Sequence, residues 1–198
     1  MKYDLTKKRT KFAERTLTAF SDALMTDLKD HALEDITVNG LCDEANYPRA
    51  TFYNYFDDIY DLLDYCWTRI AGDIDIGDYA KIEPERRTRV LFERCYDYMH
   101  LHQDEIHAIV RHNKETGHLQ ESLRRFIKKT IFTIIEACPC SEKYQGPHEM
   151  IAEHYASTIE MLLEWCFVRK IPWTGTAPLR HWTTCSETCN RYDERNRT

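Results

Sequence analysis

Residues 37–56 of the chain read Thr-Val-Asn-Gly-Leu-Cys-Asp-Glu-Ala-Asn-Tyr-Pro-Arg-Ala-Thr-Phe-Tyr-Asn-Tyr-Phe, the most informative stretch of the sequence. In its first half, apolar side chains recur at i, i+3, i+4 and i+7, the pattern of a short amphipathic helix; they are Val38, Leu41, Cys42 and Ala45. Thr37 is a favourable N-cap for this helix. Asn46, which follows it, tolerates the left-handed backbone conformation that often ends a helix. The sequence therefore predicts a short helix that ends in a tight turn.

A second short helix is predicted directly after Pro48. It hides Phe52 and Phe56, and its other face presents Arg49, Ala50, Tyr53 and Asn54. Two short helices joined by about three residues, with polar side chains on the second, have the geometry that fits the major groove of DNA. The stretch is therefore interpreted as a helix-turn-helix, and the chain is expected to bind double-stranded operator DNA.

Residues 45–56 resemble the TetR family of transcriptional regulators. That family favours a turn, a small residue, Thr, an apolar residue, Tyr, any residue, His or Tyr, and Phe, and this chain has Ala-Thr-Phe-Tyr-Asn-Tyr-Phe at 50–56. The resemblance covers about the first third of the chain and implies a cytoplasmic homodimeric repressor released by a small-molecule effector. Residues 162–170 are also similar to the Trp-containing penultimate helix of the branch that includes dihydroxyacetone-kinase regulators.

The candidate DNA contacts divide into base-reading and phosphate-binding residues. Arg49 would donate two hydrogen bonds to guanine, Asn39 or Asn54 would read an adenine edge, and Ala50 would touch a thymine methyl. The resemblance implies that four hydroxyl groups bind phosphates and fix the register; they belong to Thr37, Thr51, Tyr53 and Tyr55. The alternatives are solvated polar side chains in general and, for Tyr55, packing beneath the helix-turn-helix.

The chain departs from the family pattern in three places. Asn46 stands where Gly is usual, and Pro48 where Ser is common. Asp57 and Asp58 stand where the family carries Lys at the start of the next helix. Acidic side chains favour a helix N-terminus but repel DNA phosphates. We therefore expect DNA binding that is weaker, or more dependent on a partner, than is usual for the family.

A helical hydrophobic period runs through the whole chain, and no convincing strand pattern is present. The predicted fold is all-α, with about nine helices in a three-helix DNA-binding head, residues 1–72, and a larger ligand and dimerisation body, residues 84–198. The predicted helices are 5–29, the pair within 37–56, 58–70, 84–101, 104–112, 119–135, 148–170 and 178–192. By resemblance, the effector pocket would lie in the body, where aromatic residues either line it or fill the core; they are Phe92, Tyr96, Tyr98, Phe126 and Phe132.

Composition excludes several functional classes. The net charge is −6, yet residues 1–15 hold six basic and two acidic side chains, a local charge of +4 that suits DNA phosphates or a solvated helix start. No membrane-spanning run and no secretory signal are apparent, so a cytoplasmic protein is expected. No catalytic constellation is present, so the chain is not expected to be an enzyme.

The eight cysteines are mostly expected to be structural, without a metal or cofactor. Two groups of thiols leave a metal or redox sensor open as an alternative. Cys138 and Cys140 lack the two-residue spacing of redox or zinc motifs, whereas Cys185 and Cys189 lie on one helix face and would need further ligands.

The predicted self-association surface combines helices 148–170 and 178–192. The first has more apolar positions than one buried stripe needs, so a second copy would cover the remainder. The residues predicted at this interface are Tyr155, Ile159, Met161, Leu162, Trp165 and Trp182. The competing function is a helical adaptor whose helix-turn-helix is only structural, and the acidic start of the fourth helix is its main support.

Overall fold

The computed structural model describes Tyr3 and residues 10–77, 82–83, 86–113, 116–137 and 146–168. These residues form eight α-helices, with a 3-10 turn at Leu33–Asp35, a π-helical segment at Glu164–Val168 and no strand among them. The all-α prediction is therefore confirmed. In this part of the chain, no helix is both long and apolar enough to cross a membrane. The predicted helix 178–192 lies outside the described residues.

The first four helices are α1 (Lys11–Asp27), α2 (Val38–Ala45), α3 (Arg49–Tyr55) and α4 (Ile59–Asp73). The predicted start of the first helix, at residue 5, is too early. Thr10 has an extended backbone, and its hydroxyl oxygen accepts a hydrogen bond from the Ala13 amide at 3.1 Å. This N-cap satisfies one of the unpaired amides of the first turn, so the helix begins at Lys11.

The turn between α2 and α3 forms as the sequence predicts. The Gly40 amide donates to the Thr37 hydroxyl oxygen at 3.2 Å, which confirms Thr37 as the N-cap of α2. Asn46 has φ 54° and ψ 46°, the left-handed conformation expected of it. The Tyr47 amide then donates to the Cys42 carbonyl at 3.0 Å, and this bond satisfies an end group of α2. The turn therefore fixes the orientation of α3 relative to α2.

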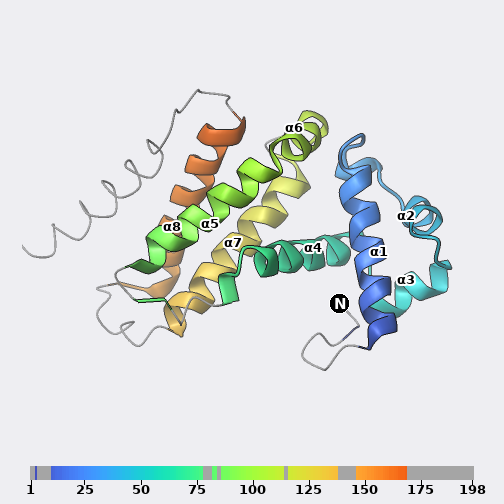
Figure 1. The fold of residues 1–198 in the computed structure, drawn as a ribbon, viewed down its shortest axis with the longest axis horizontal. Helices are drawn as coiled ribbons and strands as arrows, with labels where there is room; N and C mark the ends of the chain where they lie inside the picture. Colours follow the sequence, from blue (N-terminus) through green and yellow to red (C-terminus); the bar gives the residue numbers. More distant parts are fainter. Residues whose placement is uncertain are drawn as a thin grey trace, which may run out of the picture. The chain divides into compact units, whose positions relative to one another are not determined.

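An aromatic cluster holds α3 against α1, and Figure 1 shows α2 and α3 beside α1. Phe20 of α1 is fully buried, and its ring centroid lies 5.3 Å from that of Phe52 and 6.2 Å from that of Phe56, both edge-on. Phe52 and Phe56 are themselves fully buried, as predicted. Edge-on aromatic pairs stabilise a core beyond their buried area. The opposite face of α3 is thereby turned outward.

The described fold separates into two compact units. Unit 1 comprises Met1–Asp73 and Asp104–Thr130, and unit 2 comprises Ile74–Gln103 and Ile131–Thr198. Unit 1 thus includes most of α6 (Gln103–His112) and the first part of α7 (His118–Glu136), both of which the sequence pattern placed in the body.

Buried polar contacts explain why these helices belong to unit 1. Asn113 is only 5% exposed, and its side-chain oxygen accepts a hydrogen bond from the Leu33 amide at 2.9 Å. Its side-chain nitrogen donates to the Ile109 carbonyl at 2.9 Å, so the amide joins the end of α6 to the turn before α2. Farther along α7, the Ser122 hydroxyl accepts from the Trp67 indole at 3.0 Å. Since buried polar groups cost free energy unless paired, these bonds fix the register of both helices.

Unit 2 contains α5 (Arg87–Leu101) and α8 (His148–Leu163), which Figure 1 shows alongside each other. Phe92 of α5 is buried, and Tyr155 and Ile159 of α8 pack against it. The centroid of the Tyr96 ring lies 5.4 Å from that of Phe167, which places the π-helical segment on the same side of α5.

Candidate nucleic-acid interface

The exposed face of α3 carries most of the predicted base-reading residues. Arg49, Ala50 and Asn54 are exposed, whereas Thr51 and Tyr53 are half-buried at the edge of that face. The helix is short, and its buried face is held by Phe52 and the turn at Asn46. A helix anchored on one side presents its polar side chains in a fixed pattern, which base reading in the major groove requires.

Two side chains on this face contact each other. A guanidinium nitrogen of Arg49, Nη2, donates to the Tyr53 hydroxyl oxygen at 3.2 Å. The guanidinium carbon lies 5.5 Å from the centroid of the Tyr53 ring, within the range of a cation–π contact. The hydrogen bond to Tyr53 is the main reason that the pKa of Arg49 is raised. Sequence reasoning missed this pair, although the i, i+4 spacing was its signal.

The structure favours the packing alternative for Tyr55. Its side chain is 8% exposed and belongs to the core of unit 1. The Tyr3 ring stacks on it with a centroid distance of 5.1 Å. Of the four hydroxyl residues predicted to bind phosphate, Tyr55 is therefore the one whose side chain is buried.

Thr37 and Asn39 are both exposed at the start of α2. The Thr37 hydroxyl oxygen accepts a hydrogen bond from the Gly40 amide. The hydroxyl hydrogen of Thr37 is not used by this cap and can donate to another group. Asn39 lies one residue into the helix. Both positions are compatible with a phosphate or base contact next to α3.

The acidic residues at the start of α4 have a structural role. The Asp58 carboxylate accepts a hydrogen bond from the Asp61 amide at 2.8 Å, and the Asp61 carboxylate accepts one from the Asp57 amide at 3.0 Å. The first bond is an N-cap, and the second is similar to the return bond of a capping box, except that its donor is the residue before the cap. The acids therefore start α4, and they are not by themselves a sign that the surface avoids DNA.

Removing these charges while keeping the cap is expected to strengthen DNA binding. Asn caps a helix as well as Asp does, so Asp57→Asn with Asp58→Asn removes two negative charges without unfolding the first turn. We expect affinity for any duplex to rise by about two- to fivefold at low salt, and less at high salt. A gel shift at two salt concentrations measures this. Unchanged affinity at both would place the start of α4 away from the DNA backbone.

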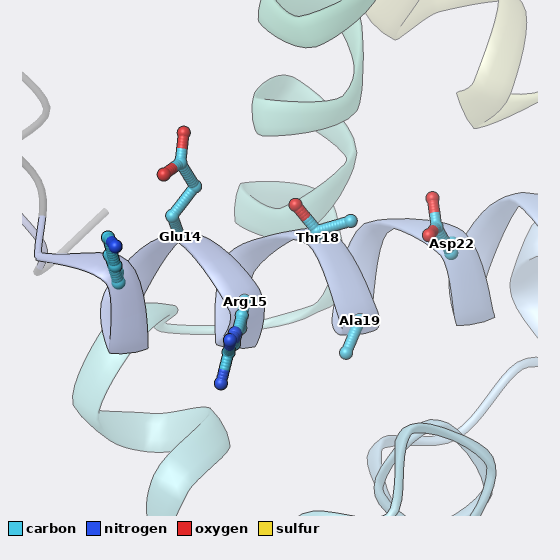
Figure 2. A pocket seen from close by; sticks show the side chains of 6 residues that line it. Glu14, Arg15, Thr18, Ala19 and Asp22 are labelled. Atoms are coloured by element: carbon cyan, nitrogen blue, oxygen red, sulfur yellow. The ribbon is translucent and has the colours of Figure 1, made fainter.

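The outer face of α1 has a shallow hollow of about 610 Å³, shown in Figure 2. Arg15 and Ala19 point to one side of the helix, and Glu14, Thr18 and Asp22 to the other. Asp22 is also paired with Arg69, at 2.7 Å. Charges of both signs line the hollow, so it is not by itself an anion site. Arg15 and Lys11 are nevertheless exposed cations near the start of α1.

Three thiols in the described residues are poorly suited to sensing. Cys66 is 1% exposed, and its sulfur lies 3.2 Å from the Ser21 hydroxyl oxygen. Burial raises the pKa of the Cys66 thiol to about 11, and burial also raises that of Cys95 to about 11. Burial likewise raises the pKa of Cys42. Since the thiolate is the reactive form, these thiols act as small apolar groups.

Cys66 is accordingly expected to resist alkylation in the folded protein. Iodoacetamide at pH 8 should leave it unmodified, because its raised pKa keeps the thiol protonated and its side chain is covered. Peptide mass spectrometry gives the extent of labelling, and protein unfolded in guanidinium is the positive control. Labelling of Cys66 in the native protein would contradict this assignment.

No group of three His, Cys, Asp or Glu side chains suited to a metal ion occurs within the described ranges. The pair Cys138 and Cys140 and the pair Cys185 and Cys189 lie outside the described residues, as does the side chain of Cys166. The metal and redox alternatives that rest on them stay predictions.

The predicted dimerisation residues separate into inner and outer positions. Tyr155 and Ile159 are half-buried against Phe92, so packing within unit 2 already accounts for part of their burial. Met161 and Trp165 are 45% and 38% exposed. The side chain of Leu162 and all of Trp182 lie outside the described residues. The ring centroids of Phe92 and Tyr96 lie 6.3 Å apart. This packing agrees with the alternative in which the aromatic residues of the body fill its core.

Comparison with known proteins gives matches in structure but not in sequence. No family model and no curated protein sequence matches it. A solved structure of a candidate transcriptional regulator from Pseudomonas aeruginosa matches with a TM-score of 0.59 and 13% identity, over 95% of this chain and 96% of that one. A candidate fatty acid metabolism regulator from Clostridium perfringens matches with a TM-score of 0.53 and 14% identity, over 83% of this chain and 94% of that one. The chain shares the fold of these two proteins.

Proposed function

We propose that the chain is a DNA-binding transcriptional regulator, and specifically a TetR-like homodimeric repressor that a small-molecule effector releases from its operator. One observation carries the proposal: α3 is anchored through Phe52 while Arg49, Ala50 and Asn54 remain exposed on its other face. Such a helix, preceded by a capped α2 and a left-handed turn, suits readout in the major groove. The remaining contacts proposed around it are Thr37, Asn39, Thr51 and Tyr53.

Two further points support a regulator over an adaptor. Both structural neighbours are described as regulators. The main support for an adaptor was the acidic start of α4, and the capping bonds of Asp58 and Asp61 account for those acids without excluding DNA. The adaptor is therefore not the function we propose.

The homodimer is proposed from the exposed apolar side chains of α8 and the π-helical segment. Met150, Met161 and Trp165 recur at helical spacing along one face and are 60%, 45% and 38% exposed. Exposed apolar patches in a regulator commonly mark an interface, and two-fold symmetry would pair this face with its own copy. Two heads placed by such a dimer would bind two half-sites.

A gel shift with the DNA upstream of the chain's own gene tests the function. We expect a discrete complex that persists with excess random duplex and weakens modestly between two salt concentrations, because few basic residues lie near the motif. A complex that random duplex removes completely at both salt concentrations would argue against sequence-specific regulation at this site.

A further inference from the structure

The pair formed by Arg49 and Tyr53 links a base-reading residue to a phosphate-binding one. We propose that Tyr53 is a positioning residue for Arg49, so that it contributes to sequence discrimination and not only to overall affinity. This inference rests on the proposed function. It changes the role that the family resemblance implies for Tyr53, which is a phosphate contact alone.

The pair is held by two contacts on one face of α3. Residues four apart on a helix are neighbours, and here the Arg49 guanidinium meets both the hydroxyl, at 3.2 Å, and the ring, at 5.5 Å. Tyr53 in turn is half-buried, and its ring is edge-on to Phe52 with a centroid distance of 5.4 Å. Because Phe52 is fully buried, the Tyr53 ring is anchored to the core. A rigid ring therefore restrains a long, flexible arginine.

The remaining hydrogen-bonding groups allow the pair to persist on DNA. A guanidinium has five N–H donors, and Tyr53 uses one from Nη2. The others still include a pair that can reach O6 and N7 of a guanine. The guanidinium can therefore keep its hydrogen bond to the Tyr53 hydroxyl while it reads a base.

Pre-organisation is the physical reason that this affects specificity. An arginine that is already restrained loses less conformational freedom when it binds guanine. This smaller entropic cost strengthens binding only where Arg49 meets a guanine, whereas a phosphate contact is made on every DNA sequence. Loss of the Tyr53 hydroxyl should therefore reduce binding to the preferred duplex more than binding to a scrambled one.

The test is a double-mutant cycle with Tyr53→Phe, Arg49→Ala and the double variant. The probes are the duplex that the wild-type protein selects from a randomised library and a scrambled duplex of the same length, both at one salt concentration. We expect Tyr53→Phe to lower the ratio of the two affinities by about three- to tenfold, the net size of one typical hydrogen bond, because this pair is exposed to solvent. In the Arg49→Ala background, Tyr53→Phe should leave that ratio unchanged.

Tyr60→Phe is the matched control, because Tyr60 is an exposed tyrosine of α4 outside the α3 face. It should leave the ratio at the wild-type value. Equal weakening of both duplexes by Tyr53→Phe would overturn the positioning role while leaving the proposed function intact, and so would no effect on either. If the wild-type protein selects no sequence, the proposed function fails and this inference fails with it.

Discussion

Met161→Asp is expected to convert the protein into a folded monomer that has lost at least about 100-fold in affinity for its operator. Met161 is 45% exposed on the proposed dimer face of α8, so a charge there would be buried without a partner in the dimer but solvated in the monomer. Joining two DNA-binding heads raises affinity by about 10²–10⁴, and a monomer forfeits this gain. Sedimentation and a gel shift on the same samples measure both effects.

Leu101→Asp is the control for this variant. Leu101 is 79% exposed at the end of α5, so the change adds the same charge at an exposed apolar site on a different helix. It should leave both assembly and DNA affinity unchanged. A wild-type protein that sediments as a monomer at micromolar concentration would contradict the dimer, and so would a Met161→Asp variant that remains dimeric.

Arg49→Ala is expected to cost about 1–3 kcal/mol of binding free energy on the selected duplex and to relax the preference at one base pair in each half-site. Arg49 is exposed at the first position of α3, and a bidentate contact to guanine is the most common specific contact that arginine makes. Affinities for duplexes with each single base change would locate the relaxed position.

Arg15→Ala provides the comparison for a cation that does not read bases. Arg15 is exposed on α1, outside the helix that we propose reads bases, so we expect it to meet only the DNA backbone. Its loss should weaken preferred and scrambled duplexes equally, since phosphate contacts are independent of sequence. If Arg49→Ala behaved in the same way as Arg15→Ala, Arg49 would be a phosphate contact.

The helix-turn-helix could be predicted because its signals are local. The Thr37 cap, the left-handed Asn46 and the buried pair Phe52 and Phe56 each follow from one residue type at one spacing, and the structure confirms all of them. The exposure of Arg49 and Asn54 followed from the same helical period. Local chemistry was sufficient here, because the motif is only two short helices long.

Contacts between distant segments could not be predicted in the same way. Asn113 directly follows the predicted helix 104–112, yet its side-chain oxygen accepts a hydrogen bond from the Leu33 amide, eighty residues away in the chain. This contact helps to place α6 in unit 1, whereas the sequence placed it in the body. The stacking of Tyr3 on Tyr55 likewise depends on geometry that no period encodes, whereas the capping role of Asp58 follows from its place at the start of a predicted helix.

Selection from a randomised duplex library tests the central claim most directly, because the selection itself reveals which sequence the protein prefers. We expect the wild-type protein to enrich a two-fold symmetric sequence with half-sites one helical turn of DNA or more apart, and each half-site to contain the guanine whose preference Arg49→Ala relaxes. Repeated rounds that enrich no sequence above the starting library would contradict this claim.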